Sequence, residues 1–382
     1  MQWNKPCYRL ESSNQSLHAL SMKCKRRLSH AGILSLILVC QGCDTQLQNE
    51  PGVLIQLEGA IKKLSTPVRC SEYVALAGDP CVIEDGGVYR IFYTGLDKAI
   101  RGGGIGSAIS SNGVDWTIVD VANPKAGKGL VLRGVNDTWQ HQLETGMVIK
   151  HDGQFFLYYS GYPKVGWPEN PGKIGVAISR DGTTFERPSS EPALPTSPEG
   201  LDANGLYSPS VIHDGAQFIM VYAGHCYPGE YGGHSNKWRT AASTAEPGIY
   251  VLGATSPDGL HWTKRDKPVL SPSSTLPWLV NGVAEPDLIR APDGQYYLFF
   301  TGNLGDDEAR LIGVARGTTP LGPWHVRPEP LLAGTPGLFD GKGVLAPSVR
   351  IEGDTLRVWY LTSDGDRHMT GYAEMPWPLP EW

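Results

Sequence analysis

Short apolar runs that alternate with polar residues recur along the whole chain. In AEPDLIRAPDGQYYLFFTG, at 284–302, two such runs flank the turn Pro292-Asp293-Gly294. Alternation with a period of two around a Pro-Asp-Gly turn is typical of a β-hairpin. An acid followed by proline, Glu285-Pro286, opens the segment. The stretch therefore predicts a hairpin with a carboxylate at its mouth.

Four further copies of this hairpin align on the apolar pair and on the small residue that ends the second run. Their starts lie 61 to 77 residues apart, at Asp79, Thr145, Ser208, Glu285 and Ala346. A second element, ending in an aromatic residue, follows each of the first four copies, at 105–116, 174–185, 252–262 and 312–324. Repeats of this kind are typical of β-propeller blades. We predict an all-β, five-bladed propeller with four antiparallel strands per blade.

The last repeat ends near Met375 with only three strands visible. We therefore expect an N-terminal strand, between Val53 and Leu76, to supply the missing outer strand and close the ring. A β-sandwich or two separate β-domains is the alternative, but neither predicts five units in one register. The 47 glycines and 30 prolines, with 40% hydrophobic residues, fit a turn-rich β-domain with a substantial core.

The first 43 residues have the pattern of an export signal. Basic residues at 23–27 precede an apolar run at 33–39, which is too short for an ordinary transmembrane helix. Gly42-Cys43 then resembles a bacterial lipobox. We predict a leader at 1–43, with an upstream extension before Met22, a tether at 44–52 and one propeller domain at 53–382. The protein is expected to be exported, as a membrane-anchored lipoprotein or as a periplasmic or extracellular protein.

Other partners are constrained by composition. The net charge of −6 provides no basic surface for nucleic acid, and the only membrane contact expected is a lipid anchor. Three cysteines remain after the leader, so a disulfide between Cys70 and Cys81 stays open. No CxxC or zinc-finger spacing occurs, and we predict no metal ligands and no cofactor. A structural cation such as calcium in the central channel is left open, as is the oligomeric state.

In a propeller the innermost strands all begin at one end of the central channel. The ring of starting residues should therefore bring Asp79 and Glu285 together, and Glu144 lies one position before the start of the second unit. Glycoside hydrolysis uses one carboxylic acid to protonate the leaving oxygen and a second carboxylate to activate water or attack. Like charges brought close together raise a pKa enough to keep one proton near neutral pH.

The Asp79-Pro80 and Glu285-Pro286 pairs, with the recurrent YYLFFTG pattern, resemble the five-bladed enzymes of glycoside hydrolase family 43 and its relatives in families 32, 117 and 130. The resemblance implies that Asp79 is the general base and Glu285 the general acid. The family's third acid begins the third blade, where this chain has Ser208. Glu144 is the candidate to replace it. The family's Gly-His motif for a central histidine is absent.

Aromatic and imidazole side chains near the inner strands are candidate sugar contacts, although most of them could equally be packing residues. The candidate substrate-binding residues are Trp139, His141, Tyr162, Tyr207, Ser208, His225 and Trp278, with Trp167 and Tyr227 in neighbouring loops.

The leading hypothesis is an exported glycoside hydrolase that acts on a poly- or oligosaccharide. A glycoside phosphorylase is the second hypothesis, and it would require cations such as Arg133, Lys173 or Arg310 at the site. A non-catalytic carbohydrate-binding propeller is the third. The sequence determines neither the sugar and its linkage nor the stereochemical outcome.

Overall fold

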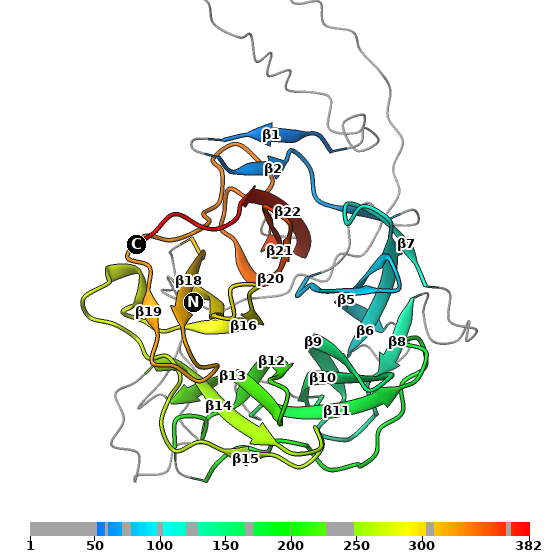
Figure 1. Ribbon diagram of the computed structural model, residues 1–382. Coiled ribbons are helices and arrows are strands. Elements are labelled where there is room, and N and C mark those ends of the chain that lie inside the picture. Colours follow the sequence, from blue (N-terminus) through cyan, green and yellow to red (C-terminus); the bar gives the residue numbers. More distant parts are fainter. Residues whose placement is uncertain are drawn as a thin grey trace, which may run out of the picture. The chain divides into compact units, whose positions relative to one another are not determined.

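Five antiparallel sheets follow one another along the chain and are arranged radially, as the blades of a β-propeller (Figure 1). The all-β, five-bladed prediction is therefore confirmed. This computed structural model describes residues 52–57, 60–70, 78–97, 102–119, 129–164, 171–198, 200–226, 248–302, 309–363 and 368–382. The predicted leader and all but the last residue of the tether lie outside these ranges. Within them, no helix is long and apolar enough to cross a membrane.

Blades 1 to 4 are formed in chain order. Blade 1 contains β4 (Cys81–Asp85), β5 (Val88–Asp97), β6 (Gly102–Ser110) and β7 (Asp115–Ile118), with β8 (Leu130–Arg133) also paired to β6. Blade 2 contains β9 (Gln142–His151), β10 (Gln154–Tyr162) and β11 (Lys173–Ser179). Blade 3 contains β12 (Leu206–His213), β13 (Phe218–Cys226), β14 (Gly248–Ser256) and β15 (Thr263–Lys264). Blade 4 contains β16 (Ala284–Arg290), β17 (Tyr296–Gly302), β18 (Leu311–Gly317) and β19 (His325–Val326), preceded by the 3-10 turn η1 (Pro277–Leu279). In blade 2 the fourth position is occupied by single bridges rather than a strand, such as Ile178 with Glu186.

Blade 5 combines the two ends of the described chain. Its inner strands are β20 (Leu345–Glu352), β21 (Thr355–Ser363) and β22 (His368–Pro376), and β2 (Lys62–Leu64) and β1 (Leu54–Gln56) continue the sheet outward. Lys63 pairs with Ala373 across β2 and β22. The next N-terminal strand, β3 (Arg69–Cys70), pairs in parallel with β7 of blade 1. That β2 is what locks the ring stays a prediction.

The first residue of each repeat has the same unusual backbone conformation. Left-handed φ values of 54°, 50°, 48°, 48° and 46° occur, respectively, at Asp79, Thr145, Ser208, Glu285 and Ala346. Such values are rare outside glycine and cost about 1–3 kcal/mol each. Their recurrence supports the register drawn from the sequence. Ala346 shares the conformation without a functional group, so the strain belongs to the scaffold rather than to the chemistry.

Two residues after the start of a repeat, the side chain accepts a backbone N–H from the inner strand of a neighbouring blade. Ser210 accepts the backbone N–H of Leu288 at 3.0 Å, and Cys81 accepts that of Val148 at 3.2 Å. The same pattern closes the ring, since Ser348 of blade 5 accepts the N–H of Val82 in blade 1 at 2.9 Å.

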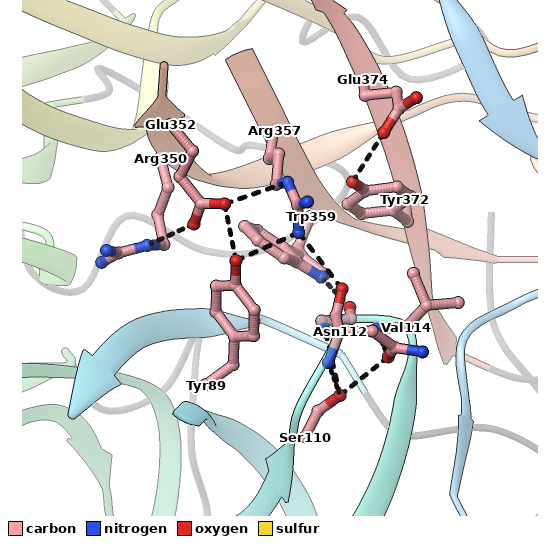
Figure 2. Close-up of polar contacts among 11 residues, drawn as sticks. Tyr89, Ser110, Asn112, Val114, Arg350, Glu352, Arg357, Trp359, Tyr372 and Glu374 are labelled. Carbon is pink, nitrogen blue, oxygen red and sulfur yellow. Dashed lines mark hydrogen bonds and ion pairs between the residues drawn. The ribbon is translucent and has the colours of Figure 1, made fainter. Parts of the chain in front are cut away.

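The seam between blades 5 and 1 carries further polar contacts (Figure 2). Tyr89 of β5 donates to Glu352 at 2.6 Å, and Arg357 of β21 pairs with the same carboxylate at 3.2 Å. The indole N–H of fully buried Trp359 donates to the carbonyl of Gly113, which lies in an outer turn of blade 1, at 2.7 Å. Polar contacts therefore connect the first and the last blade both at the channel and at the outer turns.

A buried ion pair fixes β2 in blade 5. The ammonium of Lys63 lies 2.6 Å from Asp340, and the two side chains are 1% and 0% exposed. Lys63 also donates to the carbonyl of Ala333 at 2.5 Å and to Thr335 at 3.1 Å. Tyr360 donates to the same carboxylate oxygen at 2.9 Å. Each charge is therefore surrounded by partners, as burial requires.

Blade 3 contains the same cluster. Lys264, on the fourth strand, lies 2.5 Å from Asp202, and Tyr222 donates to that carboxylate at 3.3 Å. Lys63 therefore stands in blade 5 where Lys264 stands in blade 3. This correspondence makes β2 the equivalent of a fourth strand.

Candidate active site

A cavity of about 570 Å³ lies where the inner strands begin. Its acidic lining residues are Asp79, Glu144 and Glu285, which come from blades 1, 2 and 4. The three carboxylates predicted from distant parts of the sequence therefore share one cavity. The other lining residues are Thr94, Gln142, Thr145, Tyr162, Gly172, Gly205, Leu206, Tyr207, His225, Leu345, Leu361, Ser363 and His368.

Below this cavity the channel narrows to a space of about 50 Å³, lined by three consecutive residues from each blade. Asp287 faces this space and not the upper cavity. Its carboxylate accepts the N–H of Val349 at 2.7 Å and the hydroxyl of Ser210 at 3.3 Å. Asp287 therefore belongs to the bonding between blades, even though burial raises its pKa to about 7.

Asp79 is held by a threonine of its own blade. The hydroxyl of Thr94 donates to Asp79 Oδ2 at 2.7 Å and accepts the N–H of Thr145 at 2.9 Å. Burial raises the pKa of Asp79, while the Thr94 hydrogen bond and the nearby His368 oppose the rise. The carboxyl group is thus fixed in orientation at the junction of blades 1 and 2.

Glu285 is held in an equivalent way. Thr301 donates to Glu285 Oε2 at 2.7 Å, and the N–H of Ala346 approaches the same oxygen at 3.1 Å. Burial raises the pKa of Glu285 to about 7, the charge of Asp79 adds to the rise, and Arg310 opposes it. A carboxyl group with this pKa still carries its proton over much of the range below pH 7, as a general acid must.

Glu144 differs from the other two acids because no hydroxyl partner fixes it among the described contacts. Burial raises its pKa to about 7, and the negative charge of Asp79 contributes to the shift. Asp79 is therefore the carboxylate that acts on both of the others, and two protonated acids can flank it near neutral pH.

The sequence did not single out Thr94 and Thr301, which orient the two acids. A signal was present, because a hydroxyl residue precedes a glycine at or near the end of the second strand in Thr94-Gly95, Ser160-Gly161 and Thr301-Gly302. Blade 3 has Ala223 at this position, and the hydroxyl of Ser208 has no hydrogen-bond partner among the described residues.

Three of the predicted sugar-binding residues line the cavity, namely Tyr162, Tyr207 and His225. The rings of Tyr207 and His225 lie 4.7 Å apart. Ser208 lines the narrow channel instead. Trp167 and Tyr227 lie outside the described residues.

The other three candidates lie away from the cavity lining. Trp139 stacks on Tyr159 with ring centres 6.3 Å apart, and Trp278 stacks on Phe300 at 5.9 Å. Each indole also donates its N–H to a loop carbonyl at 2.8 Å. His141 is 2% exposed and is likewise not among the cavity-lining residues. That these three side chains contact sugar stays a prediction, although none of them is among the residues that line the cavity.

The charged side chains that line the cavity, among the described residues, are acidic rather than basic. No group of three or more His, Cys, Asp or Glu side chains in these parts of the chain could hold a metal ion. No Lys or Arg among the described residues lines the cavity. Cys81 is a free thiol, and burial raises its pKa to about 12.

Comparison with solved structures identifies proteins of the same architecture. A glycoside hydrolase superposes with a TM-score of 0.62 at 17% identity, covering 83% of this chain and 90% of its own. The chain shares its fold with five-bladed glycoside hydrolases. An endo-arabinase from Bacteroides thetaiotaomicron gives a TM-score of 0.57 at 15% identity over 83% of this chain and 98% of its own. A β-1,2-mannobiose phosphorylase from Listeria innocua gives 0.57 at 11% identity over 85% and 92%.

Sequence comparison extends less far. No protein-family model matches the sequence. An uncharacterized protein of Mycobacterium tuberculosis, found in two strains, is 32% identical over 187 residues, which is 48% of this chain. The chain spans about half the length of these curated relatives, since the match covers 55% of them.

The raised pKa of Glu144 implies that the stability of the fold depends on pH. Its folded value of about 7 lies above the ordinary 4.5, so folding is favoured when the group is protonated and the benefit is lost as pH rises through 7. Glu144→Gln keeps the shape and removes the charge. We expect the variant to melt a few degrees above the parent at pH 8 and at a similar temperature at pH 4.5. Thermal melts at both pH values measure this, and an equal shift at both would contradict it.

Proposed function

We propose that this protein is a glycoside hydrolase that cleaves neutral poly- or oligosaccharides, with Glu285 as the general acid and Asp79 as the general base or nucleophile. The observation that carries the proposal is the cavity itself, in which Glu285 and Asp79 face one space and are each fixed by a threonine. An acid that retains its proton beside a carboxylate is the arrangement that glycoside hydrolysis requires.

The charge of the cavity supports a neutral substrate. Three acids line it, and no Lys or Arg among the described lining residues balances them. A uronic acid or sulfated sugar would bring a like charge into this field, which opposes binding. Tyr162, Tyr207 and Leu206 supply apolar surface for the faces of sugar rings.

The absence of Lys and Arg from the described lining residues also favours water over phosphate as the acceptor. A phosphorylase must bind orthophosphate, for which Arg and Lys are the usual partners. Arg310 acts on Glu285 electrostatically but does not line the cavity. Export and a lipid on Cys43 remain proposals that rest on the leader pattern alone.

A panel of neutral oligosaccharides, incubated with and without orthophosphate, tests this function. We expect reducing ends to appear at the same rate in both conditions and uronic acid oligomers to be cleaved poorly. Sugar 1-phosphate that forms only with added phosphate would establish a phosphorylase. Binding of sugars without any turnover, unchanged in Glu285→Gln, would establish a carbohydrate-binding propeller.

A further inference from the structure

Thr94 and Thr301 occupy equivalent places in blades 1 and 4. Thr301 pairs with Ala284, the residue before the acid of blade 4. Thr94 donates its backbone N–H at 2.9 Å to the carbonyl of Gly78, the residue before the acid of blade 1. Contacts between the first two strands therefore set the distance from hydroxyl to carboxylate, and this distance is 2.7 Å in both blades.

Each of these threonine hydroxyls also accepts a backbone N–H from the following blade. The N–H of Thr145 donates to Thr94 at 2.9 Å, and the N–H of Ala346 donates to Thr301 at 2.9 Å. An ionised carboxylate can only accept, and a hydroxyl carries a single proton. With an N–H already on its acceptor side, each hydroxyl directs its proton at the carboxylate.

Blade 2 contains the same arrangement without an acid. Ser160 accepts the N–H of Ser208 at 3.0 Å and is hydrogen-bonded to the hydroxyl of Thr145, the first residue of that repeat. The link from one blade to the next therefore belongs to the scaffold. What blades 1 and 4 add to it is a carboxylate that accepts the hydroxyl proton.

The two carboxyl oxygens of Glu285 differ in these contacts. Oε2 accepts the hydroxyl of Thr301 at 2.7 Å, and the N–H of Ala346 approaches the same oxygen at 3.1 Å. A proton on Oε2 would compete with both of these donors for the lone pairs of that oxygen. The protonated carboxyl group therefore carries its proton on Oε1.

We propose that Thr94 and Thr301 are positioning residues that set the two protonation states on which turnover depends. Thr94 keeps the Asp79 carboxylate ionised, and Thr301 directs the proton of Glu285 to Oε1. The roles of the two acids rest on the proposed function, but the hydrogen bonds do not. A donated hydrogen bond favours the ionised form of a carboxyl group, so its loss raises the pKa of the group that received it.

Other titratable and charged groups face the same two acids. Those that line the cavity are Glu144, Tyr162, Tyr207, His225 and His368, while Asp287 lies in the narrow channel below and Arg310 acts on Glu285 through its charge. Valine keeps the branched shape of threonine and lacks the hydroxyl. A threonine-to-valine variant therefore removes one hydrogen bond and leaves all of these groups in the protein.

The test compares Thr94→Val and Thr301→Val with a control, Thr362→Val, in the whole protein. Thr362 is a buried threonine of β21 whose hydroxyl donates to the carbonyl of Gly343 at 2.7 Å. The control variant thus loses a similar hydrogen bond that no acid receives.

Carboxyl groups labelled with ¹³C in Asp and Glu are titrated by NMR, with Asp79→Asn and Glu285→Gln backgrounds to assign the signals. We expect Thr94→Val to raise the pKa of Asp79, and Thr301→Val that of Glu285, each by about half a unit or more, while the control moves neither. Unchanged values in the two folded variants would overturn the proposal, whether or not a substrate is known. If a valine variant does not fold, the alanine variant at that position takes its place.

The pH dependence of oligosaccharide cleavage provides the second measurement. Its acidic limb follows the ionisation of Asp79, and its alkaline limb follows the proton of Glu285. Thr94→Val should move the acidic limb to higher pH and narrow the profile, whereas Thr301→Val should move the alkaline limb to higher pH and widen it. Thr94→Ser and Thr301→Ser keep the hydroxyl and should follow the profile of the parent.

The outcomes separate this proposal from the proposed function. A lower rate in the valine variants with neither limb displaced would make both threonines merely structural and overturn the proposal. If the parent protein cleaves no sugar but the titration shifts appear, the proposed function fails and the control of the two carboxyl groups by their threonines stands.

Discussion

Replacing Glu285 with glutamine is expected to lower kcat on natural oligosaccharides by about 10²- to 10⁴-fold, because an amide cannot protonate the leaving oxygen. Glutamine keeps an oxygen that can accept the Thr301 hydroxyl and the Ala346 N–H, so the fold and KM should change little. Initial rates over a range of substrate concentrations measure both parameters.

Asp287→Asn is the matched control for this variant. Asp287 lies two residues from Glu285 and has a similarly raised pKa, but it faces the narrow channel and bonds to neighbouring strands. Its replacement should lower stability while leaving kcat within a few-fold of the parent. A comparable loss of kcat in both variants would show that Glu285 has no special role.

Substrates with different leaving groups can show whether Glu285 is a general acid or has only a structural role. An aryl glycoside whose leaving group is a weak base needs no proton, so Glu285→Gln should cleave it at a rate much closer to that of the parent. With a pKa of about 7, Glu285 loses its proton above neutrality, and the parent's kcat on natural substrates should decline there. In the Gln variant that alkaline decline should disappear. Its persistence would assign the acid to another group.

The sequence predicted the repeat because a propeller imposes the same local pattern on every blade. Hairpin alternation and the turn residues are decided by neighbours in sequence, and the aligned starts indeed share one backbone conformation. The meeting of Asp79, Glu144 and Glu285 also followed, since the symmetry alone brings the blade starts together.

The direction in which a side chain points was harder to predict from the sequence. Trp139 and Trp278 look like sugar platforms in sequence, but each fills space above a glycine, and a Cβ at Gly161 or Gly302 would lie 2.6 Å from their rings. Pairing between an indole in one loop and a glycine far along the chain has no local signal. The contact between Lys63 and Asp340 also has no local signal, because the two residues are 277 positions apart in the sequence and meet only in the folded propeller.

Removing one partner of that buried pair should have the largest effect on stability of any substitution in blade 5. Asp340→Ala leaves the ammonium of Lys63 buried without its counter-ion and takes an acceptor from Tyr360. Breaking a buried ion pair on one side typically costs about 3–5 kcal/mol. Burial already lowers the pKa of Lys63, and without Asp340 the lysine should lose its proton more readily. Urea unfolding at pH 7 measures the free energy of unfolding, and a loss smaller than about 1 kcal/mol would contradict the expectation.

Lys62→Met and Lys63→Met separate the ion pair from the strand that carries it. Lys62 is the neighbour on β2, its side chain is 49% exposed and its contact with Glu374 is 3.4 Å long. An exposed pair of this kind contributes about 0–1 kcal/mol, so Lys62→Met should be nearly neutral. Lys63→Met should be strongly destabilising, whereas Lys63→Met combined with Asp340→Leu should recover much of the loss, because apolar side chains can replace a buried pair. Recovery would show that β2 requires well-packed, uncharged side chains at this place in blade 5, and does not require the ion pair itself. If Lys63→Met alone is neutral, the N-terminal strand is not what holds the ring closed, and the contacts of Ser348, Glu352 and Trp359 with blade 1 must do so.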